Sequence, residues 1–151
     1  MLNPNNFRLQ SVLDLKSSMV DNLEIEFASL KTSHNQEVAR LDQLEQDKDR
    51  QLDQLARQQQ GQIDCQSIQL HHQFLSGLDR QLNQQAERVE TARQQMEGKR
   101  QELVDTMQDQ KSLEKLRDRH QDQVRRDQQR RETRTTDDLV IAKYGRERLN
   151  R

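Results

Sequence analysis

Apolar residues recur at alternating intervals of three and four along this chain, and this spacing constrains the fold more than any other feature. A first stripe of such residues starts at Leu9 and continues for about seven heptads. Its apolar members are Leu9, Leu13, Val20, Leu23, Phe27, Leu30, Leu41, Leu44 and Leu55. Its polar members are Lys16, His34, Glu37, Lys48, Gln51 and Gln58. The spacing predicts one long helix, about residues 6–58, that carries a coiled-coil seam.

A second stripe follows with the same spacing. Its apolar members are Ile68, Leu75, Leu78, Leu82, Val89, Ala92, Met96, Leu103, Leu113 and Val124. Its polar members are Gln85, Lys99, Thr106, Gln110 and His120. The two stripes are out of phase by one residue, which would rotate the apolar face of an uninterrupted helix by about 100°. Because the phase changes inside RQQQGQIDCQS (57–67), we predict a turn at about 59–66 and a second helix at about 67–145.

The predicted turn contains residues suited to ending one helix and starting another. Gly61 can adopt the left-handed conformation that terminates a helix, and Asp64 or Ser67 can cap the next one. A reversal near residue 62 would place Leu41 opposite Leu82. The fold class is therefore predicted to be all-α, with two long helices forming an antiparallel coiled-coil hairpin. Two alternatives are a kinked continuous helix that dimerises in parallel and a turn at Gly77.

Composition supports long helices with a narrow core. Only 30% of the residues are hydrophobic, against about 45–50% in a globular domain. One proline and four glycines in 151 residues favour helix over disorder. We predict a single coiled-coil domain over 1–151, in which residues 119–151 extend beyond the paired helices as a C-terminal overhang. Because TRTTDD (133–138) is poor helix material, Thr136 or Asp137 is predicted to cap a short final segment before Gly145.

The end of the chain is basic. Residues 111–151 carry 13 Lys and Arg against 8 Asp and Glu, so that region has a net charge of +5. The run 125–134 could bind nucleic acid electrostatically. It lacks interleaved aromatic residues for base stacking, so a solvated helix face or an acidic protein groove is the favoured interpretation.

The chain contains no pattern that indicates catalysis. Phosphate-binding glycine loops and Cys-x-x-Cys pairs are absent from the sequence, and the adjacent His71 and His72 point about 100° apart on a helix. We therefore predict a non-enzyme with no cofactor and no metal. The single Cys65 and the lack of an apolar signal or span predict a soluble, cytoplasmic protein. Polar residues in the seam could fix register, mark a flexible rod or contact another protein.

Three segments resemble the flagellar export protein FliJ family. NFRLQSVLDLK resembles the family's opening pattern, which is matched by Phe7, Leu9, Val12 and Leu13. QFLSGLDRQL (73–82) is similar to the start of its second helix, which is matched by Phe74, Leu75, Leu78 and Leu82. ETRTTDDLVIAKYGRER (132–148) is similar to its C-terminal signature, which is matched by Asp137, Asp138, Leu139, Ala142, Tyr144 and Arg146.

This resemblance implies a non-enzymatic, chaperone-like stalk of the flagellar type III export apparatus. Its implied partners are the export ATPase hexamer, the membrane export gate and export chaperones. Its implied place is the cytoplasm, peripheral at the inner face of the cell membrane through those partners. Exposed residues early in the second helix bind the gate in this family, so the resemblance implies that role for Phe74 and Leu78.

The C-terminal matches Asp137, Asp138, Tyr144 and Arg146 are the other candidate partner-binding residues. His71 and His72 stand where relatives often carry aromatic residues. Alternative functions are the equivalent stalk of a virulence secretion system, a nucleic-acid-associated basic coiled coil and a homodimeric structural spacer.

Overall fold

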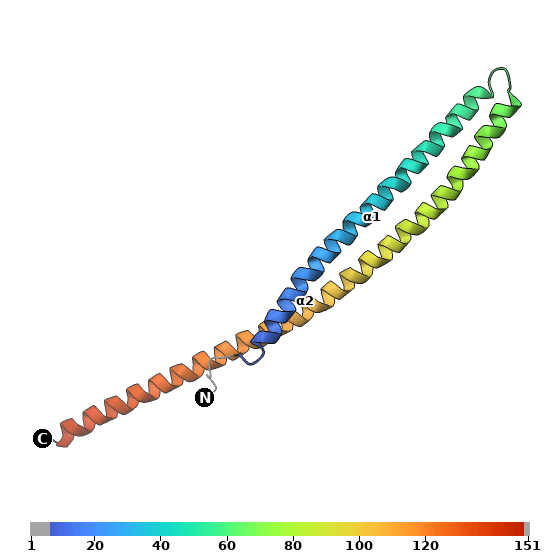
Figure 1. Ribbon diagram of the computed structural model, residues 1–151. Coiled ribbons are helices and arrows are strands. Elements are labelled where there is room, and N and C mark those ends of the chain that lie inside the picture. The colour runs from blue at the N-terminus through green and yellow to red at the C-terminus, as the bar shows by residue number, and fades with distance from the viewer. Residues whose placement is uncertain (1–6, 150–151) are drawn as a thin grey trace. The chain divides into compact units, whose positions relative to one another are not determined.

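A computed structural model describes residues 7–149, with side chains through residue 146, and contains two helices. Helix α1 spans Gln10–Gln58 and helix α2 spans Cys65–Leu149. Their contacts group into two compact units. The hairpin unit is Asp21–Val104, and the terminal unit is Met1–Val20 with Asp105–Arg151. In the hairpin unit the two helices run antiparallel on either side of the turn (Figure 1), so the predicted all-α antiparallel hairpin is confirmed.

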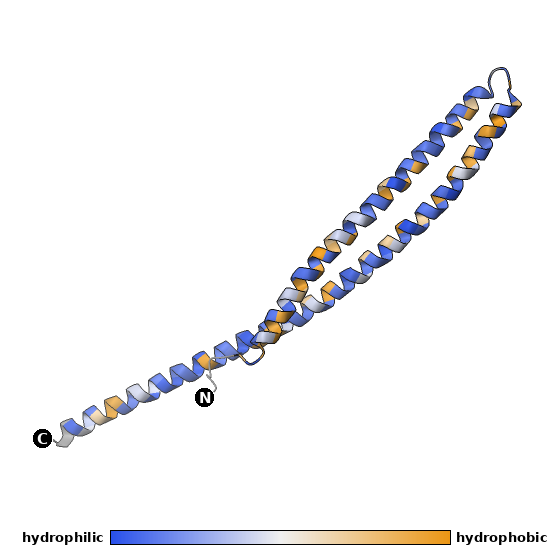
Figure 2. Ribbon diagram, viewed as in Figure 1, coloured by the Kyte–Doolittle hydropathy of each residue, from blue (hydrophilic) through white to orange (hydrophobic). Residues whose placement is uncertain are grey.

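The seam follows the two predicted stripes. The buried apolar side chains are Leu13, Val20, Leu23, Leu55, Leu75 and Leu78, and all six belong to the predicted stripes. The intervening members, such as Phe27, Leu41 and Met96, are half-buried. In the hairpin unit, many hydrophobic positions lie on the facing sides of the helices, and the outer sides are mostly hydrophilic (Figure 2). A two-helix seam leaves most of each helix in water, which explains why 30% hydrophobic residues are sufficient.

Polar side chains within the seam pair across the two helices. In the hairpin unit, Lys48 Nζ lies 2.7 Å from Asp79 Oδ1, and Lys99 Nζ lies 2.9 Å from Glu26 Oε2. In the terminal unit, Lys16 Nζ lies 2.8 Å from Asp109 Oδ2. Each bridge joins residues far apart in sequence, so it favours one alignment of α1 on α2. Of the three interpretations of the polar seam, register fixation is the one that these pairs support.

These pairs agree with the predicted alignment within the hairpin unit. Asp79 lies opposite Lys48, and Gln85 donates a hydrogen bond to the Glu37 carbonyl. Residue 82 of α2 therefore lies level with residues 40–45 of α1, where the sequence predicts Leu41.

The turn comprises residues 59–64 and differs from the predicted one in its backbone. No described residue, Gly61 included, has a positive φ, so the prediction of a left-handed Gly61 is wrong. A six-residue loop has enough freedom to reverse the chain with ordinary conformations. Asp64 caps α2 as predicted, because its Oδ1 accepts a 3.1 Å hydrogen bond from the Gln66 amide. Ser67 instead donates to Gln58 Oε1 across the turn, at 3.2 Å.

The predicted break at residues 133–138 is wrong, because α2 continues through this segment to Leu149. Thr133, Thr135 and Thr136 each donate a 2.9 Å hydrogen bond to the carbonyl four residues earlier. Threonine hydroxyls that bond back in this way are satisfied inside a helix and do not cap a new one. The predicted start of the first helix near Asn6 lies outside the described residues, and α1 itself begins at Gln10.

A buried polar layer near the centre of the hairpin unit predicts a measurable coupling. Gln85 is 3% exposed, and its Nε2 donates to the Glu37 carbonyl at 2.9 Å and to Glu37 Oε2 at 2.6 Å. Gln85→Leu should lower the free energy of unfolding by about 1–2 kcal/mol, because it leaves the carboxylate without its donor. Replacing both residues by leucine should instead raise that free energy above the wild-type value, by about 1 kcal/mol. Urea titration of the two singles and the double measures this coupling, and a double variant less stable than either single would contradict it.

The Lys99 bridge predicts a loss of stability at alkaline pH. Hydrogen bonds to Glu102 and then to Glu26 raise the pKa of Lys99 to about 12. A raised folded-state pKa means that this stabilisation is complete below 10.5, the ordinary lysine value, and is lost as pH rises through about 12. The melting temperature should therefore fall between pH 10 and pH 12. The fall should be smaller for Lys99→Met, and an equal fall in both proteins would contradict this account.

Candidate partner-binding surfaces

Phe74 lies on the outer side of the hairpin, although its neighbours are core residues. Its side chain is 53% exposed, whereas Leu75 and Leu78 are buried in the seam. The reason is helical spacing. Residues 75, 78 and 82 occupy seam positions, and residue 74 is rotated about 100° from residue 75. The predicted exposed position of Phe74 is confirmed.

Leu78 does not share that exposure. Its side chain is only 6% exposed and packs in the seam, so the expectation that Leu78 presents an exposed contact is wrong. The sequence had already placed Leu78 in the heptad stripe, and that periodicity determines its position. Leu78 holds the helix in place while Phe74, one turn earlier, faces outward.

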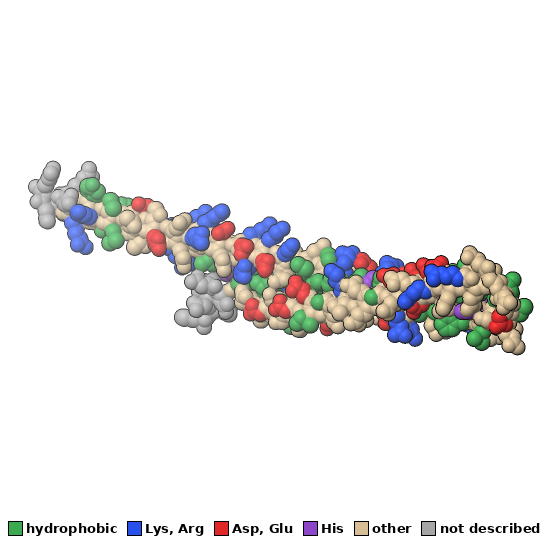
Figure 3. Space-filling view, turned by 90° about the horizontal axis from the view of Figure 1, so that it is seen from above, with side chains coloured by type: hydrophobic (Ala, Val, Ile, Leu, Met, Phe, Trp, Pro, Cys, Tyr) green, Lys and Arg blue, Asp and Glu red, His purple; other side chains and the backbone are tan. Residues whose placement is uncertain are grey.

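Other apolar side chains near the turn are exposed with Phe74. Leu70 is one helical turn before Phe74 on the same face and is 70% exposed, and Ile63 in the turn is also exposed. We name Ile63, Leu70 and Phe74 the turn patch. Hydrophobic side chains are visible at the end of the hairpin unit that holds the turn (Figure 3). The sequence reasoning missed Ile63 and Leu70, although their absence from both stripes was the available signal. His71 beside them is half-buried and His72 is exposed.

The four C-terminal candidates all lie on α2 in the terminal unit. Asp137, Asp138, Tyr144 and Arg146 are exposed. The adjacent side chains Leu139, Val140 and Ile141 are exposed too. Within the described part of the chain, residues 121–146 are solvent-exposed except for the half-buried Val124. In this C-terminal segment, the apolar side chains other than Val124 are exposed in the described structure.

Lys and Arg side chains follow the same segment (Figure 3). Arg126, Arg130 and Arg134 are four residues apart and therefore share one face, together with Gln129 and Thr133. The Arg130 guanidinium lies 4.0 Å from the Asp127 carboxylate. The segment therefore offers cationic and apolar side chains on one unpacked helix, which suits a partner with an acidic lining.

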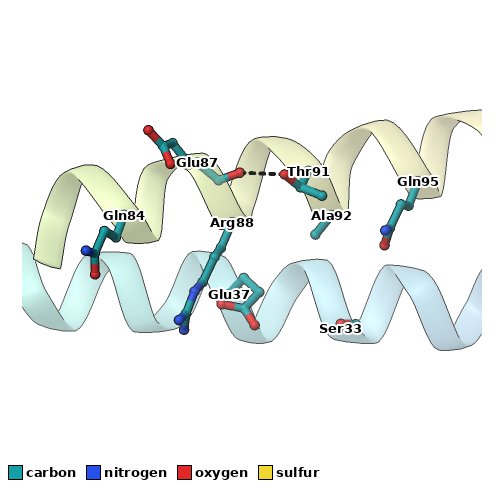
Figure 4. Close-up of a pocket in the computed structure, with 8 residues that line it drawn as sticks. All are labelled: Ser33, Glu37, Gln84, Glu87, Arg88, Thr91, Ala92 and Gln95. Carbon is teal, nitrogen blue, oxygen red and sulfur yellow. Dashed lines mark hydrogen bonds between the residues drawn. The ribbon is translucent and has the colours of Figure 1, made fainter.

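A shallow hollow lies between the helices of the hairpin unit. Ser33 on α1 and Ala92 on α2 border it, and Arg88 extends from α2 toward α1 beside Glu37 (Figure 4). Thr91 donates to the Glu87 carbonyl at 2.9 Å and so stays within its own helix. Among the residues that the structure describes, no group of three His, Cys, Asp or Glu could hold a metal ion.

Neither helix contains, within its described residues, an apolar stretch long enough to cross a membrane. Comparison with curated proteins gave no match, and comparison with solved structures gave none.

The comparison with protein families gave one match that covers almost the whole chain. The family described as "Flagellar FliJ protein" matches residues 5–149, which include both helices and the turn. The match confirms the predicted resemblance to this family. The chain therefore belongs to the FliJ family, whose members are non-catalytic components of the flagellar export apparatus.

Proposed function

We propose that this chain is a stalk that links the hexameric export ATPase to the membrane export gate of the flagellar type III apparatus. The observation that carries the proposal is the exposure of Phe74 beside a completed seam. Leu75 and Leu78 already fill the hairpin core, so the core does not use the Phe74 ring. An exposed aromatic residue with apolar neighbours is a typical anchor for a protein partner.

The turn patch is the proposed gate-binding surface. Phe74 and Leu70 lie on one face of a helix that the seam holds rigid, so little conformational entropy is lost when a partner covers them. Leu78 contributes to gate binding indirectly, because its packing in the seam fixes the part of α2 that carries Phe74. The half-buried His71 and the exposed His72 make the rim of this surface more polar than an aromatic pair would.

The C-terminal segment is the proposed ATPase-binding surface. Ile141 and Tyr144 lie one turn apart and are 69% and 66% exposed, so they present an apolar face. Arg146, two residues after Tyr144, supplies a positive charge on another face of the same helix. Asp137 and Asp138 precede this apolar face, and their carboxylates can accept hydrogen bonds from the ATPase hexamer. A cationic helix with an apolar end can enter an acidic, apolar-lined channel.

The remaining expectations follow from these two contacts. A stalk that binds both the ATPase and the gate would be held at the inner face of the cell membrane through its partners. Export chaperones are a third proposed partner, and they would bind the protein during transfer of their cargo.

Amide exchange of the C-terminal segment tests the ATPase contact. An isolated helix has little stability of its own, so residues 121–146 should exchange rapidly in the free protein at low micromolar concentration. Adding the ATPase hexamer should slow their exchange at least tenfold and leave residues 21–104 nearly unchanged. Strong protection of this segment in the dilute free protein, or no change on adding the ATPase, would contradict the proposal.

A further inference from the structure

One side of α2 in the C-terminal segment carries a row of arginines that ends in apolar side chains. Among residues 121–146 only Val124 is half-buried, and the other side chains are exposed. Each residue turns the helix by about 100°, so side chains within about 60° of one line along it share one face. That face holds Arg126, Arg130, Arg134, Val140, Ile141 and Tyr144. We name these six residues the outer face.

The cationic and the apolar side chains of the outer face occupy different lengths of the helix. Arg126, Arg130 and Arg134 are four residues apart, so each step rises by about 6 Å along the axis. The apolar side chains follow within three turns of the last arginine. Those of Val140, Ile141 and Tyr144 are 46%, 69% and 66% exposed. A helix that lies flat on a surface presents one face to it, so the arginines and the apolar side chains would meet the same plane.

Carboxylates are mostly on other sides of this described segment. Asp137 is the one acidic residue between 126 and 144 that falls on the outer face, whereas Asp127, Glu132 and Asp138 are rotated about 80–100° from its centre line. The Arg130 guanidinium lies 4.0 Å from the Asp127 carboxylate. An exposed pair within one helix contributes little, so Arg130 still acts as a cation toward a charged surface. The outer face therefore has an excess of positive charge.

The chemistry of the outer face fits a phospholipid surface better than a nucleic acid. Phosphates of nucleic acid would pair with the arginines, but they would not cover the aliphatic side chains that follow, and base stacking requires interleaved aromatic residues. A bilayer with anionic phospholipid offers phosphates to the arginines and an acyl boundary to the apolar end. We propose that the outer face docks on an anionic phospholipid bilayer. The helix lies in the plane of the membrane, with its arginines on the headgroups and its apolar end inserted.

This membrane contact goes beyond the proposed stalk function and does not rest on it. It uses one side of the C-terminal segment. A channel in the ATPase would surround the helix and would also contact Leu139, which is 67% exposed on the opposite side. Membrane docking is therefore a state of the chain in which the ATPase does not hold this segment. The bilayer would stabilise the helix, because an isolated helix has little stability of its own.

Vesicle binding tests the docking and its chemistry. The full-length chain should co-sediment with vesicles in which about a third of the phospholipid is phosphatidylglycerol, and not with vesicles of phosphatidylcholine alone. Raising the salt concentration from about 0.05 M to about 0.3 M should weaken binding about tenfold, because exposed charges are screened. A wild-type chain that does not bind the anionic vesicles, or that binds both lipids equally, would overturn the proposal. So would a chain that binds duplex DNA and leaves the vesicles unbound.

Two triple variants separate the outer face from net charge. The first removes the arginines of the outer face: Arg126→Gln, Arg130→Gln and Arg134→Gln. The matched control removes three exposed arginines from the other sides of the same helix: Arg125→Gln, Arg131→Gln and Arg146→Gln. The first variant should weaken vesicle binding about thirtyfold and the control no more than about threefold, because only the outer face contacts the headgroups. Equal weakening by the two variants would overturn the proposal.

Tyr144 reports on insertion of the apolar end. It is the only tyrosine, and the chain has no tryptophan, so the tyrosine emission comes from one residue of the outer face. Brominated acyl chains in the anionic vesicles should reduce this emission at least about twofold, because the ring would lie at the acyl boundary. Ile141→Gln should weaken vesicle binding about tenfold, and Leu139→Gln on the opposite side should leave it unchanged. Bound protein with unquenched Tyr144, or equal effects of the two substitutions, would overturn the proposal.

Discussion

Leu78→Ala is expected to lower the free energy of unfolding by about 2–4 kcal/mol. Leu78 is 6% exposed and lies in the seam of the hairpin unit, where the core is only two helices wide. The leucine side chain is buried in this narrow seam, so its removal leaves a gap that few neighbours can fill. Urea denaturation followed by circular dichroism measures the effect.

Phe74→Ala is the matched control for this measurement. The two positions are one turn apart on α2, yet Phe74 is 53% exposed. Its truncation should change the free energy of unfolding by no more than about 0.5 kcal/mol, as for an ordinary surface position. Equal destabilisation by the two substitutions would mean that Phe74 packs in the core, and it would contradict the seam described here.

Phe74→Ala is also expected to weaken binding to the cytoplasmic domain of the export gate at least thirtyfold. An aromatic anchor at the centre of an apolar patch commonly contributes 2 kcal/mol or more to binding, and every 1.4 kcal/mol is tenfold in affinity. Leu70→Ala, on the same face, should have a smaller effect in the same direction. Isothermal titration of the wild type and the variants against the gate domain measures both.

The exposed Leu52 provides a control for nonspecific apolar contact. It lies on α1 in the hairpin unit, is 44% exposed and does not belong to the turn patch. Leu52→Ala should leave gate binding unchanged. If Leu52→Ala and Phe74→Ala weakened gate binding equally, gate binding would not be specific for the turn patch.

Periodicity alone predicted most of the fold. The two heptad stripes located the buried leucines, because only one narrow face of each helix can point into a two-helix seam. The one-residue phase break between the stripes located the turn. Residue 74 is outside both stripes, and the structure accordingly leaves Phe74 on the flank of the seam.

Local propensity was less reliable than periodicity. Gly61 suggested a left-handed helix end, but the six-residue loop reverses the chain without one. TRTTDD suggested a break, but its threonines bond to their own helix. The TRTTDD segment admits two local solutions, and the context of a long cooperative helix selects the helical one.

The partner surfaces could be predicted only in part. The resemblance to the family suggested Leu78 as an exposed contact, but the heptad frame buries it. Leu70 was overlooked because no sequence motif marks it, and its absence from both stripes was the one available signal. Its proximity to Phe74 becomes apparent only when the residues outside the seam are considered together.

Bridging of two partners by this chain is the most direct test of the proposed stalk function. The gate domain is immobilised, and capture of the ATPase hexamer is measured by biolayer interferometry with and without the chain. We predict that the ATPase is captured only when the wild-type chain is present. Capture should be lost with Phe74→Ala although that variant still binds the ATPase. If the gate domain and the ATPase instead displaced one another from the chain, they would share one surface, and the proposed link between two partners would be wrong.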